Sequence, residues 1–145
     1  MIAEAERLLR DEERGWAELR AVLGRIPTDR VEEPGVTDEG WSAKDVMFHV
    51  GAWLAEAARQ LERIRAGTYV VEGDRVEERN RAWYALSRTL DLPTVRVELA
   101  SSRVIAHEAL AGLVEVTPEA REWFEESAAL HYAEHLPDLV RWLGA

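Results

Sequence analysis

The feature that most constrains the fold is the spacing of apolar residues, which recur at steps of three and four through most of the chain. Such steps place side chains on one face of an α-helix, because an α-helix has about 3.6 residues per turn. No run of alternating polar and apolar β-branched residues is long enough to indicate a β-strand. The spacing therefore predicts an all-α protein in which each helix buries one face.

Proline, glycine and helix-capping residues divide this pattern into helical segments. The expected segments are 2–26, 43–66, 76–90, 92–113 and 117–143. Ser42 and Asp45 have the spacing of a capping box, in which two side chains cap each other's backbone N–H groups. Gly67 stands where a helix-ending glycine is expected, and Pro118 stands in the first turn of the last segment. Residues 27–41 lack a period and are predicted to be a long connection, which often borders a site.

These segments fit a four-helix bundle with a long first connection, in which four principal helices surround one core. The long connection is compatible with a crossover between helices. At 145 residues, the chain is expected to form one domain that covers residues 1–145. Its charged N-terminal stretch lacks the apolar core of a signal peptide, and no stretch is apolar enough to span a bilayer. A cytoplasmic protein without a membrane partner is therefore expected.

Composition excludes several classes of chemistry. The formal net charge is −10 at pH 7, whereas a protein that binds DNA or RNA needs a surplus of Lys and Arg on one face. No nucleic-acid partner is expected. Cysteine is absent, so the chain has neither a thiolate metal ligand nor a nucleophilic cysteine. Any thiol chemistry must therefore use an external thiol.

Three of the four histidines lie on faces that the spacing predicts to be buried. His131 and His135 form the motif HYAEH, and residues four apart in a helix point the same way, with Cβ atoms about 5–6 Å apart. His49 lies on the predicted buried face of the second segment. Three neutral imidazoles with an open position are typical of a catalytic zinc site or a related divalent-metal site. We therefore predict that His49, His131 and His135 bind a divalent metal ion.

A simpler interpretation remains open for each of these histidines. The HxxxH motif alone is a weak signal, because such pairs arise by chance and a buried histidine often hydrogen-bonds to a carbonyl or a hydroxyl. Their shared placement favours the metal, since unpaired imidazoles in a core are costly. His107 has no partner at helical spacing and is expected to be an ordinary surface or half-buried residue. Glu56, Tyr132 and Glu134 could orient the imidazoles. However, the spacing turns Tyr132 and Glu134 away from the core, and a simpler role for Glu56 is to face solvent or to pair with Arg59 or Arg63.

Three stretches resemble a known family: GWSAKDVMFHVGAW, NRAWYALSRTLDLPTVRVELASSR and HYAEHLPDLVRWL. Together they are similar to the DinB-like metal-binding four-helix bundles, over nearly the whole chain. That superfamily includes YfiT-type hydrolases and the N-terminal domain of mycothiol-dependent maleylpyruvate isomerase. The resemblance implies the same bundle, with His49, His131 and His135 as the metal ligands. The chain ends soon after its last helix, so we do not expect the second domain of the isomerase or its maleylpyruvate chemistry.

The open three-histidine site and the resemblance together suggest a metal-dependent enzyme. The leading hypothesis is transfer of a low-molecular-weight thiol, mycothiol or bacillithiol, to an electrophilic small molecule, with Zn, Ni or a similar divalent ion lowering the pKa of the thiol. One alternative is a hydrolase that uses a metal-bound hydroxide, and another is a non-catalytic stress protein that binds a metal or a small molecule. Catalytic residues and a cofactor-binding residue set are not identified. A homodimer is expected on general grounds.

Overall fold

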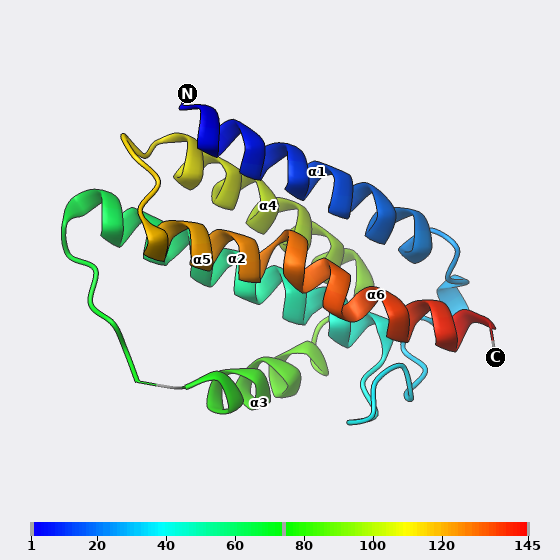
Figure 1. Ribbon diagram of the computed structural model, residues 1–145. Coiled ribbons are helices and arrows are strands. Elements are labelled where there is room, and N and C mark those ends of the chain that lie inside the picture. The colour runs from blue at the N-terminus through cyan, green and yellow to red at the C-terminus, as the bar shows by residue number, and fades with distance from the viewer. Residues whose placement is uncertain (1, 74, 145) are drawn as a thin grey trace.

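The computed structural model describes residues 2–73 and 75–144. Within these residues every regular element is a helix, and there is no β-strand. Its elements are α1 (Ala3–Leu23), the 3-10 turn η1 (Thr28–Arg30), α2 (Ala43–Ala66), α3 (Val76–Ser87), α4 (Leu92–Ala111), α5 (Pro118–Ser127) and α6 (Ala129–Gly144). Four rods form a bundle, namely α1, α2, α4 and the in-line pair α5 and α6, while the shorter α3 lies beside it (Figure 1). The predicted all-α four-helix bundle is therefore confirmed. None of these helices is long and apolar enough to cross a membrane.

The long first connection does not form the crossover with which the sequence was compatible. α1 packs mainly against α6, whereas α2 packs mainly against α4 and α5. α1 and α2 run in opposite directions, so the connection between them passes across one end of the bundle (Figure 1). The crossover that returns along the bundle is instead the segment 67–91, which contains α3 and links the parallel helices α2 and α4. This second connection places α3 beside α2.

Local sequence sets the ends of α2 and α4. Ser42 and Asp45 form the predicted capping box: the Asp45 N–H donates to Ser42 Oγ at 3.1 Å, and the Ser42 N–H donates to Asp45 Oδ2 at 2.9 Å. Gly67 ends α2 with a φ of 75°, a left-handed conformation that glycine adopts at little cost. Asp91 caps α4 by accepting a hydrogen bond from the Thr94 N–H at 2.9 Å.

The prediction of one continuous last helix over 117–143 is wrong. Ala128 has φ −113° and ψ −105°, which separates α5 from α6. Backbone hydrogen bonds continue on both sides, because the Ala128 N–H donates to the Phe124 carbonyl and the Tyr132 N–H donates to the Ala128 carbonyl. Neither proline nor glycine stands at this position, so the residue types do not signal the break. α5 and α6 still run in line (Figure 1).

α2 packs closely against α4, because Gly51 has no side chain at their contact. A Cβ atom built on Gly51 would lie 3.2 Å from the Cα atom of Leu99. The largest fully buried apolar side chains come from every rod of the bundle: Leu8, Leu19, Leu54, Leu61, Leu110, Phe124, Tyr132 and Leu139. Burial of this apolar surface is the main favourable contribution to folding, and it fixes α2 at a set distance from its neighbours.

A fully buried carboxylate, Glu12, ties α1 to α4 and α6. The Arg103 guanidinium donates to both carboxylate oxygens, at 2.6 and 2.9 Å, and the Tyr132 hydroxyl donates to Oε2 at 2.9 Å. His107 Nε2 lies 2.8 Å from Oε1. Burial raises the pKa of Glu12, but the close contacts with His107 and Arg103 outweigh it and lower that pKa to about 2. Glu12 is thus a charged group whose partners come from two other helices.

The expectation that Tyr132 turns away from the core is wrong. Tyr132 is 1% exposed, because its hydroxyl reaches Glu12 on α1. The adjacent His131 points to α2, and neighbouring residues of a helix lie about 100° apart around its axis. α6 therefore buries two sides, one against α2 and one against α1, where the spacing analysis allowed only one.

Replacing Glu12 by alanine is expected to lower the free energy of unfolding by about 3–5 kcal/mol, because Arg103 would keep its partly buried charge without an acceptor. Urea unfolding followed by circular dichroism measures this difference. The control is Glu13→Ala, which removes an exposed carboxylate from the neighbouring position and is expected to change stability by no more than about 0.5 kcal/mol. Equal effects of the two substitutions would contradict a structural role for the Glu12 contacts.

Candidate metal centre

The three predicted histidines lie together between α2 and α6. His131 Nε2 is 2.9 Å from His49 Nε2 and 2.9 Å from His135 Nε2. One ligand nitrogen from each ring lies within 4.8 Å of the other two, an arrangement that could hold a metal ion. His49 and His131 are buried, and His135 is half-buried. The structure thus brings together all three residues that sequence spacing selected.

Helix geometry explains why two of these rings share one direction. His131 and His135 are four residues apart on α6, and their ring centroids are 4.6 Å apart. His49 comes from α2, and its ring centroid lies 4.8 Å from that of His131 and 5.0 Å from that of His135. Both α6 rings lie edge-on to the His49 ring, and the Nε2 atoms of His49 and His131 are in direct contact.

Hydrogen bonding between the rings does not account for both contacts of His131. A neutral imidazole nitrogen carries either one N–H or one lone pair, so His131 Nε2 can form one well-directed hydrogen bond but not two. Two nitrogens bound to a tetrahedral zinc ion at about 2.0–2.1 Å lie about 3.3 Å apart, so the rings that are 2.9 Å apart here would need to move outward by only about 0.4 Å. Three imidazole lone pairs that share one cation would all be satisfied. The ligand set therefore fits a divalent metal ion.

Burial keeps these imidazoles neutral. Burial and the nearby His135 lower the pKa of His49 to about 3, and burial with the two other rings lowers the pKa of His131 to about 2. Burial also lowers the pKa of His135, against the opposing effect of nearby carboxylates. The neutral imidazole is the form that binds a metal ion. A cation at this position would therefore not compete with protons at neutral pH.

An aromatic layer covers the site on the side of the long first connection. The ring centroid of Trp41 lies 4.8 Å from that of His49, and Tyr84 on α3 stacks on Trp41 at 5.7 Å with 14° between the planes. The Ser87 hydroxyl at the end of α3 donates to Asp45 Oδ1 at 2.6 Å, which holds α3 against the start of α2. The first connection therefore borders the site, as predicted, but the contributions of Tyr84 and Ser87 had no sequence signal.

None of the three residues considered for orienting the imidazoles forms a hydrogen bond with them. Glu56 pairs with Arg59 at 2.9 Å. Tyr132 donates its hydroxyl to Glu12, and Glu134 is exposed and affects the site through its charge on His135. His107 is half-buried, as expected, and its contact with Glu12 was not anticipated.

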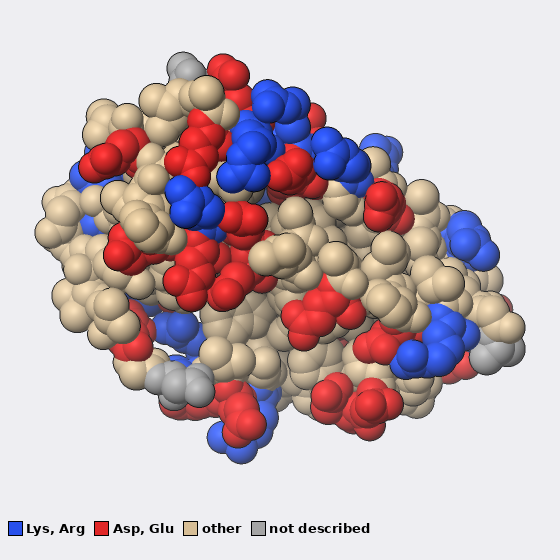
Figure 2. Space-filling model, viewed as in Figure 1, with Lys and Arg blue, Asp and Glu red and all other residues tan. Residues whose placement is uncertain are grey.

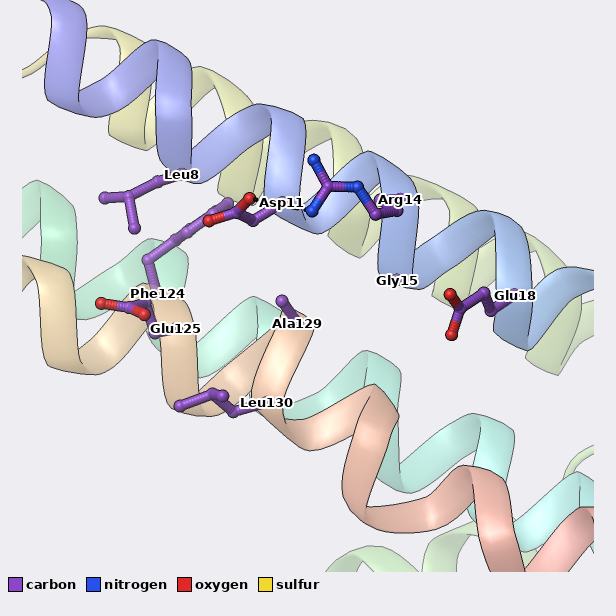
Figure 3. Close-up of a pocket in the computed structure, with 9 residues that line it drawn as sticks. All are labelled: Leu8, Asp11, Arg14, Gly15, Glu18, Phe124, Glu125, Ala129 and Leu130. Atoms are coloured by element: carbon purple, nitrogen blue, oxygen red, sulfur yellow. Dashed lines mark hydrogen bonds and ion pairs between the residues drawn. The ribbon is translucent and has the colours of Figure 1, made fainter.

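The site opens on one side into a cavity of about 740 Å³, which His49 and His131 help to line together with residues of α2, α3, α5 and the segment before α3. A cavity of this size accommodates a small molecule. A second hollow of about 350 Å³ lies between α1 and the α5–α6 rod, where Asp11, Arg14 and Glu125 line it (Figure 3). None of the three histidines reaches that second hollow, so the first cavity is the one that serves the site.

Comparison with known proteins supports the fold alone. The chain is similar to TT2238, described as a four-helix bundle protein, whose crystal structure matches with a TM-score of 0.66 at 21% sequence identity. The match covers 94% of this chain and 98% of that one. No protein-family model and no curated protein matches the sequence. At this low identity the likeness shows a shared four-helix bundle and carries no information on activity.

The stability of the metal-free protein is expected to fall as the pH is lowered from 7.5 to 5. An unfolded histidine has a pKa of about 6.5, whereas the pKa values of folded His49 and His131 are about 3 and 2, so only the unfolded chain gains these protons. Each of the two should cost about 2 kcal/mol at pH 5. Urea unfolding at both pH values measures the loss of stability. The loss should be smaller by about 2 kcal/mol in the His49→Leu variant, which lacks one of the two histidines. An identical pH dependence of the two proteins would contradict a neutral, buried His49.

Proposed function

We propose that His49, His131 and His135 bind a divalent metal ion such as Zn or Ni, and that the protein is a metal-dependent enzyme. The observation that carries this proposal is the 2.9 Å approach of His131 Nε2 to both other Nε2 atoms, beside a cavity of small-molecule size. The resemblance of the HYAEH motif and of the stretch around His49 to the DinB-like metal-binding bundles supports it.

The reaction that we propose is transfer of a low-molecular-weight thiol to an electrophilic small molecule. A bound divalent cation lowers the pKa of a thiol, so that the nucleophilic thiolate is present at neutral pH. The chain contains no cysteine, so the thiol must come from outside, and mycothiol and bacillithiol are the candidates that the resemblance suggests. The histidines hold the cation, and the cavity beside them positions the second substrate.

The protein's own side chains contribute positioning and exclusion of water. Trp41 packs against His49 on one side, and Trp53 lines the cavity on the other. These apolar rings keep the surroundings of the three nitrogens poor in water, where electrostatic interactions are stronger than in bulk solvent. The Glu12 contact holds Tyr132 and therefore keeps its neighbour His131 directed at α2.

Removing the metal is expected to abolish thiol transfer. The protein is purified without an affinity tag or added metal, its metal content is measured by elemental analysis, and conjugation of mycothiol and bacillithiol to model electrophiles is assayed before and after chelation. His131→Ala should lose both the metal and the activity, because only two of the three imidazoles remain. Arg141→Ala is the matched control, since Arg141 is an exposed residue of the same helix that pairs with Asp138 and not with the site, and it should keep both.

The same assays distinguish the alternatives. Metal-dependent hydrolysis of esters or amides without a thiol would favour a hydrolase over a thiol transferase, since the same cation can activate water. Metal content that is unaffected by His131→Ala would rule out the site itself. A metal-loaded protein without either activity would indicate a non-catalytic binding protein.

A further inference from the structure

We propose that the 740 Å³ cavity binds a small molecule that carries a cationic amino group, held by the carboxylates of α5 and by the rings of Trp53 and Trp123. This inference rests on the proposed function in one respect, because it names the substrate class for the same site. The binding preference itself is argued from the walls of the cavity and does not depend on the reaction.

An unpaired hydrogen-bond acceptor in the cavity wall indicates a ligand with N–H groups. Gln60 lines the cavity, is 1% exposed, and donates its Nε2 to Glu56 Oε1 at 2.9 Å. This bond fixes the orientation of the amide, because a carboxylate only accepts hydrogen bonds. Gln60 Oε1 is then buried without a hydrogen-bond partner. Buried polar atoms are rarely left unpaired, so a ligand N–H group in the cavity would supply the missing hydrogen bond.

The two guanidinium groups of the cavity are already engaged. Arg79 pairs with Glu72 at 2.8 Å and with Glu56 at 3.2 Å, and Arg75 pairs with Glu78 at 3.3 Å. Neither guanidinium is therefore available to balance a further carboxylate. An anionic ligand would have to displace one of these pairs before it could be bound.

Three carboxylates on α5, by contrast, have no partner within the part of the chain that the structure describes. Glu119, Glu122 and Glu126 line the cavity and form neither an ion pair nor a hydrogen bond there. Figure 2 shows acidic side chains gathered over α5. Partial burial, with Glu122 and Glu125, raises the pKa of Glu126, which means that its negative charge is unfavourable in this setting. A ligand cation would relieve this repulsion.

The aromatic walls suit an ammonium group with an apolar body. The ring centroids of Trp53 and Trp123 are 6.4 Å apart, and both rings line the cavity. Their N–H groups are engaged within the protein, Trp53 with Asn80 at 2.9 Å and Trp123 with Tyr69 at 3.1 Å. The indoles are thus held in place, and their faces can attract a cation electrostatically. The Arg79 guanidinium already lies 5.9 Å from the Trp53 ring.

These observations together favour an amine over an acid or a neutral molecule. The carboxylates supply charge, the amide oxygen of Gln60 supplies an acceptor, and the two indoles supply apolar surface. His49 and His131 line the same cavity, so an amine bound there lies beside these two imidazoles.

The test compares three probes of the same size: phenethylamine, 2-phenylethanol and phenylacetate. Quenching of tryptophan fluorescence and calorimetry at pH 7.5 measure their affinities for the metal-loaded protein. Phenethylamine should bind most tightly, 2-phenylethanol about tenfold more weakly, and phenylacetate most weakly of all. The double variant Glu122→Gln with Glu126→Gln should weaken phenethylamine about tenfold and leave 2-phenylethanol unchanged.

Glu125→Gln is the matched control, because Glu125 lies between these residues on α5 but lines the other hollow. Because the charge of Glu125 acts on Glu126 only from a distance, this variant should change the affinity for phenethylamine by less than about twofold and leave the other two unchanged. The proposal is overturned if phenethylamine does not bind, if the alcohol or the acid binds as tightly, or if Glu125→Gln has the effect of the double variant. Metal content measured on the same samples separates the two proposals. Metal retention without a preference for the amine would overturn only the proposed substrate class. A preference for the amine in a protein that binds no metal would overturn only the proposal of a metal-dependent enzyme.

Discussion

The approach of three neutral imidazole nitrogens to one another is the constraint on which the site depends. His131 Nε2 has two close nitrogen neighbours, and a single lone pair or a single N–H cannot satisfy both. Buried polar groups without a partner are costly, so a bundle that holds this arrangement needs something shared between the rings. A divalent cation is the simplest shared partner, because each imidazole presents one lone pair to it.

The bundle holds this arrangement through contacts that lie away from the histidines. Next to His131, Tyr132 is held by Glu12, whose carboxylate also binds Arg103 on α4. On the other helix, Gly51 allows α2 to lie close against α4, two residues beyond His49. The direction of each histidine is therefore set by the packing of its own helix, and the rings need no rearrangement to face a common point. Such preorganisation is what binding of a cation with a fixed geometry requires.

The sequence predicted interactions between residues close together in the chain more reliably than contacts between distant segments. The capping box of Ser42 and Asp45 and the shared direction of His131 and His135 are local properties of a helix, so residue spacing was sufficient. The burial of Tyr132 was missed, because a single apolar stripe was assumed for α6 and its partner lies on α1. The break at Ala128 carries no residue signal, and the acceptor left unpaired at Gln60 depends on how α2 meets the neighbouring segments.

The most direct test of the account is a crystal structure of protein purified without added metal, with diffraction data collected on both sides of the zinc and nickel absorption edges. The account predicts an anomalous peak about 2.0–2.2 Å from the Nε2 atoms of His49, His131 and His135. A map without a peak at this point, with the three rings turned apart to hydrogen-bond carbonyl or hydroxyl groups, would contradict it.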